Sequence, residues 1–208
     1  MSQLKLTADS GGGTVAIKGP ASTAGNAAIE LTVPGTGNAT LATTSDSFGK
    51  ILQVQYAVKK DTASNSLATQ TWWSVYNAGF QVTLTPSSAS NKILLIAQIM
   101  YSEGSGQWYQ FRFEKNGAFD SAFGGDAANS RFRVTAQHDN QTDNNAGRTV
   151  TMVAQIDAGD TNSRIYNIAL RHTSGATRTM YLNRTATDND THAYGRGIST
   201  ITAMEIAA

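Results

Sequence analysis

The sequence contains no cysteine. This absence excludes disulfide bonds, thiolate metal sites and cysteine nucleophiles. A protein that works outside a cell without disulfides must gain stability in another way, and oligomerisation is a common one. Charged residues are also scarce, at 15% of the chain, against about 25% in an average globular protein. Thr, Ser, Asn and Gly take their place, and these residues favour turns and strand surfaces over helices.

Long apolar runs are absent as well. The longest, residues 93–97, is far too short to cross a bilayer, and the first residues lack the charged and apolar regions of a secretory signal. We therefore expect a soluble protein that is made in the cytoplasm and has no membrane partner. The formal net charge is +1, and Arg131 and Arg133 alternate as on the solvent side of a strand. No nucleic-acid partner is expected, because phosphate binding needs a concentrated basic face.

Motifs for metal binding and catalysis are missing too. The histidines lack metal-ligand spacing, and His172 is expected to be an ordinary edge residue at the end of a strand. No nucleophile elbow, P-loop or dinucleotide fingerprint is present. Glu103 lies in a turn-like loop, and Asp120 and Asp126 lie in another glycine-rich loop. They could supply the carboxylate pair of a glycosidase, but any many-stranded sandwich offers such pairs by chance. We expect neither enzyme activity nor a cofactor.

The sequence is rich in apolar–polar alternation with period two, which Gly, Pro, Asn and Ser interrupt. Short strands are expected at 14–18, 28–33 and 39–43. No aromatic residue precedes Phe48, so these strands cannot build a core of their own. We therefore predict an N-terminal extended β arm, residues 1–48, for attachment and trimer contacts, followed by a head domain, residues 49–208.

Longer strands and aromatic residues characterise the head. Strands are expected at 51–58, 71–76, 80–85, 92–101, 108–114, 131–137, 149–156, 164–172, 179–184 and 199–206. Turn signals such as Lys115-Asn116-Gly117 separate them, and no stretch has a helical period. This spacing indicates a sandwich or barrel. We expect an all-β fold with a jelly-roll-like β-sandwich, in which the two-sided apolar strand that begins at Lys92 is central.

Several stretches of the chain resemble structural, fibre-like virion proteins of tailed bacteriophages, especially marine phages. They are residues 11–23, 29–34 and 37–43 near the N-terminus, and 84–88, 92–94 and 198–206 in the head. The resemblance implies a virion protein with a trimeric β-sandwich head. Such proteins serve as capsid decorations, head fibres or tail-fibre tips, and no functional residue carries over.

The alternation gives each strand of the arm one apolar face. The side chains on these faces are Val15, Ile17, Ile29, Leu31, Val33 and Leu41. Burying each contributes roughly 1.5–3 kcal/mol, less the cost of ordering the arm. We therefore predict that they attach a homotrimer to the major capsid protein or another virion protein. The expected function is a trimeric capsid decoration (cement) or head-fibre protein, located in the virion.

A receptor- or glycan-binding tip module of a tail fibre is the alternative function. Trp72, Trp73, Trp108 and Tyr194 could form a platform on which sugar rings stack, with host-surface glycan as the partner. Tandem tryptophans at a strand start also suit a split between core and interface. The segment Asp188–Asp190 has part of a calcium loop but lacks the other ligands of an EF-hand. It is therefore read as a polar loop, with ion binding as the alternative.

Overall fold

The computed structural model describes residues 3–7, 14–18, 50–103, 108–138 and 146–208. The chain divides into two units, Met1–Asp46 and Ser47–Ala208. The described part of the first unit is one antiparallel hairpin of β1 (Gln3–Thr7) and β2 (Thr14–Lys18). Strand β2 agrees with the strand expected at 14–18, whereas β1 was not expected. The strands expected at 28–33 and 39–43 lie outside the described residues.

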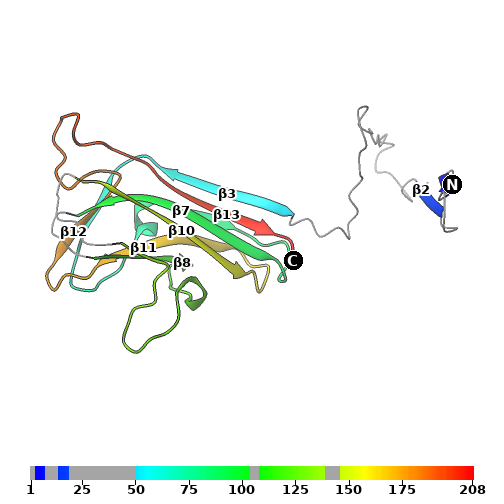
Figure 1. The fold of residues 1–208 in the computed structure, drawn as a ribbon, viewed down its shortest axis with the longest axis horizontal. Helices are drawn as coiled ribbons and strands as arrows, with labels where there is room; N and C mark the ends of the chain where they lie inside the picture. Colours follow the sequence, from blue (N-terminus) through cyan, green and yellow to red (C-terminus); the bar gives the residue numbers. More distant parts are fainter. Residues whose placement is uncertain (1–2, 8–13, 19–49, 104–107, 139–145) are drawn as a thin grey trace. The chain divides into compact units, whose positions relative to one another are not determined.

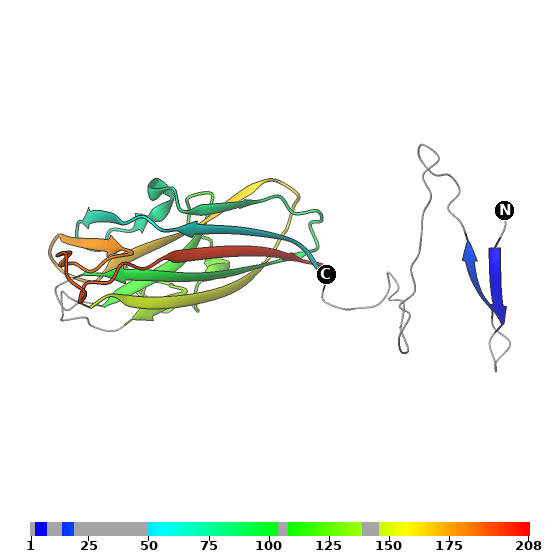
Figure 2. The same cartoon turned by 90° about the horizontal axis from the view of Figure 1, so that it is seen from above.

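The second unit is all-β and contains two antiparallel sheets (Figure 1). In the first sheet, four strands lie side by side in the order β3 (Ile51–Lys59), β13 (Ser199–Ile206), β7 (Lys92–Ser102) and β10 (Arg148–Asp157), as Figure 2 shows. Two shorter strands, β4 (Ala63–Leu67) and β12 (Arg178–Leu182), pair with each other, and β12 also pairs with the end of β7. Thus β4 extends the row of β3, and β12 extends the row of β13.

The second sheet is built around β11 (Arg164–His172). On one side β11 pairs with β8 (Tyr109–Lys115), which pairs in turn with β9 (Ala136–His138). On its other side lie β5 (Trp73–Ser74) and β6 (Gln81–Leu84), which share one row. If strands that share a row (β3 with β4, β5 with β6, β12 with β13) are counted as one, the described strands of the head form eight rows in chain order. From edge to edge, the first sheet consists of rows one, eight, three and six. The second sheet consists of rows two, seven, four and five.

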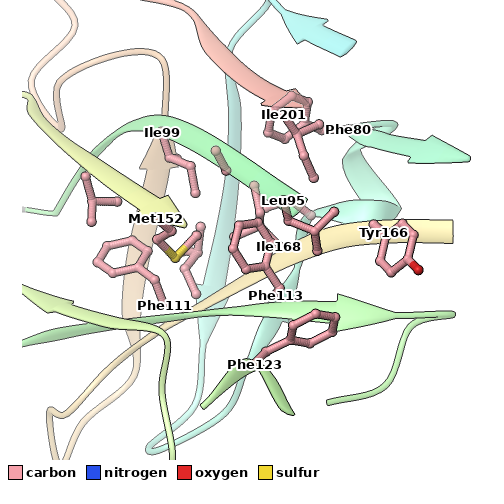
Figure 3. Packing of buried hydrophobic residues seen from close by; sticks show 14 of the residues in the cluster. Phe80, Leu95, Ile99, Phe111, Phe113, Phe123, Met152, Tyr166, Ile168 and Ile201 are labelled. Carbon is pink, nitrogen blue, oxygen red and sulfur yellow. The ribbon is translucent and has the colours of Figure 1, made fainter. Parts of the chain in front are cut away.

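The inner faces of the two sheets enclose one hydrophobic core (Figure 3). The strand alternation supplies it with fully buried side chains, among them Ile93, Leu95 and Ile99 of β7, Phe111 and Phe113 of β8, and Tyr166, Ile168 and Leu170 of β11. The period-two interpretation of these strands is confirmed. The central position of β7 is confirmed as well, because β13 and β10 flank it.

Three parts of the head differ from the expected strands. The strand at 71–76 is reduced to Trp73–Ser74, because a 3-10 helix, Val75–Ala78, follows and ends at Gly79 in the left-handed conformation (φ +70°). The strand at 131–137 is reduced to Ala136–His138. Strand β4 was missed because its sequence, Ala63 to Leu67, has no apolar alternation, and pairing with β12 defines it.

The arginines at 131 and 133 are therefore not on a strand. Both lie in the loop before β9. The Arg133 side chain donates hydrogen bonds to the backbone oxygens of Gly125 (2.6 Å) and Ser121 (2.8 Å), so it holds this loop together.

Between β12 and β13 the chain leaves the sheet and then returns to the same row. We call residues 184–198 the excursion loop. Met100, on the outer face of β7, packs against the backbone of this loop at Gly197 and against Gly147, where a Cβ atom would collide with its side chain. The described residues contain only short 3-10 helices, and none has the length or hydropathy of a membrane-crossing helix.

Candidate functional site

A groove of about 790 Å³ lies on the outer side of the second sheet, where β8 begins and β11 ends. We call it the Arg171 groove. Its lining residues are Gln70, Trp108, Gln110, Ser130, Arg131, Phe132, Gln137, Arg171 and Thr173. The volume is within the range of small-molecule sites. Among the residues that the structure describes, the lining combines aromatic rings, amides, hydroxyls and arginines and contains no carboxylate.

Strand register brings the floor of this groove together. Tyr109 and Phe111 point into the core, so Gln110 between them points outward. Gln110 is paired with Arg171 of β11 on one side and with Gln137 of β9 on the other. The Gln110 side chain donates a hydrogen bond to Gln137 Oε1 at 3.0 Å, while Gln110 Oε1 is buried without a partner.

Two arginines and three aromatic rings alternate along this side of the sheet. The Arg171 guanidinium lies 3.8 Å from the ring centre of Phe132 and 5.4 Å from that of Trp72. The Arg112 guanidinium lies 4.1 Å from Trp72 and 5.0 Å from Phe119. We call these five side chains the aromatic–arginine ladder. Cation–π contacts of this kind contribute about 0.5–2 kcal/mol each, so the ladder holds both guanidinium groups in place.

The two arginines differ in how their charge is compensated. Arg112 pairs with Glu114 at 2.8 Å. No carboxylate among the described residues pairs with Arg171, which is only 3% exposed. Its side chain donates one hydrogen bond of 3.3 Å to the backbone oxygen of Gln70, and its Nε–H has no acceptor among the described residues. Burial, and then the charge of Arg112, lower the pKa of Arg171 from its ordinary value. The groove therefore contains a positive charge that its described surroundings do not neutralise.

The structure separates the four aromatic residues considered for glycan contact. Trp108 lines the Arg171 groove and is 56% exposed. Trp72 lies in the ladder, with Nε1 buried and unpaired. Trp73 is buried in the core. Tyr194 lines a separate hollow of about 380 Å³ beside the excursion-loop residues Asp188–Thr191 and Arg196.

Sequence reasoning missed Arg171, Gln110 and Phe132 as site residues. The alternation of β11 and β8 places Arg171 and Gln110 on the side opposite the core, and that signal was available. Nothing in the sequence indicates that the loop around Phe132 comes back to cover Arg171.

Three of the carboxylates considered for catalysis or ion binding, Glu103, Asp120 and Asp188, have other partners. Glu103 is buried and accepts a hydrogen bond from the Tyr109 hydroxyl at 2.6 Å. Asp120 pairs with Lys115, whose hydrogen bond is the main cause of the lowered pKa of Asp120. Asp188 pairs with Arg196 (2.8 Å) and Arg184 (2.9 Å), and both lower its pKa. Among the described residues no group of three His, Asp or Glu side chains is arranged to hold a metal ion.

His172 is fully buried and is not an exposed edge residue: β8 pairs with it on one side, and its ring reaches the backbone oxygen of Leu67. The backbone N–H of Ser174 donates to its Nδ1 at 3.1 Å, so the ring proton is on Nε2 and is donated to the Leu67 oxygen at 3.2 Å. Of the residues proposed for particle attachment, Val15 and Ile17 belong to β2. The other four, Ile29, Leu31, Val33 and Leu41, lie outside the described residues.

The outer face of the first sheet is a second candidate surface, and Figure 2 looks onto it. Strand pairing forms three rungs across β3, β13, β7 and β10, listed in that strand order. The first rung is Val58, Thr200, Gln98 and Thr151. The second is Tyr56, Thr202, Ile96 and Val153, and the third is Val54, Met204, Leu94 and Gln155. We call these three rungs the apolar face. Val54, Tyr56, Val58 and Val153 are exposed, with Tyr56 at 60% and Val153 at 59%. No charged residue belongs to any of the rungs.

No protein-family model matches the chain, and no curated protein sequence matches it. Among solved structures the chain is similar to one described as the structure of infectious bursal disease virus, Gx strain, with a TM-score of 0.36 and 11% sequence identity. The alignment covers 85% of this chain and 41% of the viral chain, so this chain spans less than half the length of that one.

Proposed function

We propose that this protein is a non-enzymatic structural subunit of a virus particle, which assembles with copies of itself into a homotrimer through the apolar face. Within the particle it acts as a capsid decoration (cement) or head-fibre protein of a tailed bacteriophage. Its N-terminal arm attaches it to the major capsid protein or another virion protein.

The apolar face is the observation that carries this proposal. Its exposed side chains are joined across the sheet by Leu94, Ile96 and Met204, which are half-buried, into one continuous surface. Soluble monomers rarely expose large contiguous apolar patches, and such patches mark interaction sites. Covering this surface would remove it from water, which contributes about 25 cal/mol per Å² of apolar area.

The lack of charge on the face favours further copies of this chain as the occupant. In a three-fold ring one patch contacts a different patch of the next subunit, except near the axis, where side chains meet copies of themselves and charges of one sign would repel each other. The three rungs avoid this problem because all their residues are neutral. At one end of the face, Lys92 and Asp157 pair with each other and so do not require a charged partner.

The row order of the two sheets supports the jelly-roll class for the head. In a jelly roll, two Greek keys place consecutive strands in alternate sheets, and viral capsid and lectin domains use this architecture. The resemblance of several stretches to phage virion proteins supports the location in a particle.

The test is the mass of the full chain in solution, measured by light scattering at micromolar concentration. Tyr56 and Val153 lie on one rung, so a Tyr56→Lys/Val153→Lys variant places two like charges in the middle of the face. We expect three times the 22.0 kDa chain mass for the unaltered protein and the mass of one chain for this variant. Tyr76→Lys, at an exposed position outside the face, is the matched control and should remain trimeric. A monomeric unaltered protein, or a trimeric double variant, would contradict the proposal.

A receptor- or glycan-binding module is the second candidate function. The Arg171 groove favours it, because exposed Trp108 and a buried, uncompensated arginine line one concave site. The copy number in purified particles distinguishes the two, since a decoration protein is far more abundant than a tip protein. Quantitative gel electrophoresis of particles measures this ratio.

A further inference from the structure

We infer that the Arg171 groove binds an acidic sugar, a pyranose ring that carries a carboxylate. The guanidinium of Arg171 receives the carboxylate, and the indole of Trp108 receives the ring. This inference rests on the second candidate function, the glycan-binding module, and names the ligand class of its site.

The charge of the groove selects an anion. Arg171 is almost completely buried, and a buried charge is costly unless it is paired. Its described surroundings supply one backbone oxygen, while Arg131 adds a second cation to the lining, and no acidic residue opposes them in the described part of the chain. A ligand carboxylate would supply the missing acceptor, and the planar fork of a guanidinium matches the two oxygens of a carboxylate.

The groove is also prepared for a hydrogen-bond donor. Gln110 Oε1 is a buried acceptor without a partner, and Gln110 is paired with Arg171 across the two strands. An unpaired donor and an unpaired acceptor therefore occupy neighbouring positions of one site. A sugar acid satisfies both, because its carboxylate accepts and its hydroxyls donate. A sulfate ion or a DNA phosphodiester, which has no hydrogen-bond donor beside its charge, would leave Gln110 unsatisfied.

Aromatic side chains supply the surface for the ring. Trp108 is 56% exposed and Phe132 is 47% exposed at the groove. The face of an aromatic ring is electron-rich, and the C–H groups on one side of a pyranose ring provide a complementary apolar, slightly positive surface. Ser130, Thr173 and Gln70 line the rest of the groove and offer hydrogen bonds to sugar hydroxyls.

The arginine is held in position before any ligand arrives. Its guanidinium carbon lies 3.8 Å from the ring centre of Phe132 and 5.4 Å from the ring centre of Trp72. A group that is already ordered loses little side-chain entropy on binding. The ladder thus acts as the support of the site, and Trp72 positions Arg171 without contacting the ligand.

A single strand of nucleic acid is the rival anionic ligand, since aromatic rings also stack on bases. It requires a basic path along several phosphates, whereas Arg131 and Arg171 are the only cations among the described residues that line the groove. The chain as a whole carries a net charge of +1. These observations favour a ligand of one or two sugar rings over a polymer bound through its backbone.

Isothermal titration calorimetry of the full chain tests the inference. The probes are a short oligogalacturonate and the same oligosaccharide with its carboxylates reduced to alcohols. We expect the reduced sugar to bind at least about 10-fold more weakly, because it cannot pair with Arg171. Trp108→Ala should weaken oligogalacturonate binding about 10-fold or more, whereas Tyr76→Ala, a substitution of an exposed aromatic residue outside the groove, should leave it unchanged. Arg171→Lys, which keeps the charge and loses the fork, should also weaken it, provided its circular dichroism matches that of the unaltered protein.

Each other outcome counts against a defined part of the inference. Equal affinity for the acidic and the reduced sugar would overturn the choice of an acid and leave the glycan-binding function standing. Binding of an oligothymidylate with the same dependence on Trp108, without binding of sugar, would identify a nucleic-acid site instead. No binding of any probe would overturn both the inference and the second candidate function. Binding that Trp108→Ala and Arg171→Lys leave unchanged would place the ligand outside this groove.

Discussion

The hydroxyl of Ser199 donates a hydrogen bond of 2.7 Å to the side-chain oxygen of Asn183, across the base of the excursion loop. Asn183 also donates two bonds of 2.9 Å from Nδ2, to the backbone oxygens of Lys59 and Asp61. It is fully buried and has a φ of +60°, a conformation that asparagine tolerates better than most residues. One side chain therefore joins the end of β12, the start of β13 and the passage from β3 to β4.

Asn183→Asp should destabilise the head by about 3 kcal/mol or more. The substitution replaces a donor with a carboxylate that faces two backbone oxygens, and it leaves a buried charge unpaired. Asn183→Gly keeps the backbone conformation and loses only the side-chain bonds, so it should cost less. Urea unfolding measures both. An Asn183→Asp protein as stable as the unaltered one would show that the junction does not depend on these bonds.

Glu205 should make the protein sensitive to acid. Burial alone would raise its pKa, but hydrogen bonds from Asn91, Gln53 and Ser87 to the carboxylate outweigh burial and lower the pKa from 4.5 to about 2. A lowered pKa contributes stability that is present above the unfolded-state pKa and is lost as the pH falls towards 2. The contribution at neutral pH is on the order of 3 kcal/mol.

Glu205→Gln provides the comparison for this effect. We expect the free energy of unfolding of the variant to be lower than that of the unaltered protein at pH 7. The difference should narrow as the pH falls from about 4.5 towards 2, because only the unaltered protein takes up this proton. Urea unfolding at a series of pH values measures the difference, and a constant difference would refute the assignment.

Trp72→Ala should destabilise the head by roughly 2–3 kcal/mol, since both Arg112 and Arg171 lose the ring between them. Trp72→Phe should cost less, because a smaller aromatic ring remains. Trp108→Ala is the matched control, and with its exposed side chain it should stay within about 0.5 kcal/mol of the unaltered protein. If Trp72→Ala also falls within that range, the ladder contributes nothing to stability.

Deletion of residues 1–46 should leave a folded head that no longer joins particles. The described core lies entirely in the second unit, so the truncated protein should keep the circular dichroism of its sheets and a cooperative unfolding transition. Incubation with particles that lack this protein, followed by sedimentation, measures attachment. Normal occupancy by the truncated protein would mean that the surface of the head, not the arm, is the anchor.

Local alternation made much of the fold predictable. In β11, Tyr166, Ile168 and Leu170 all face the core, so period two and burial agree. The strand expected at 131–137 was largely wrong, because Phe132 and Val134 alternate with arginines as in a strand although they lie in the loop before β9. Phe132 instead contacts Arg171. Strand β4 has a polar sequence and is defined by hydrogen bonds to β12, a partner far along the chain that no local pattern identifies.

The candidate site was less predictable than the fold for a similar reason. Trp108 was predicted as part of a platform on which sugar rings stack, and it does line the groove. Arg171 was not predicted as a site residue, because a lone arginine on the outer side of a strand is normally solvated. Its importance comes from burial by residues that lie more than thirty positions away in the sequence, Phe132 and Trp72.

The excursion loop has a consequence for how the surface of this protein can change over time. Because β12 and β13 occupy one row and the bond between Asn183 and Ser199 closes the junction, the strand register on either side does not depend on the exposed tip of the loop, residues 189–193. Foreign peptides grafted there would be displayed from the head without altering the core. In evolution the same segment is free to lengthen, shorten or exchange sequence, so it is a place where new recognition properties can arise while the sheets stay unchanged.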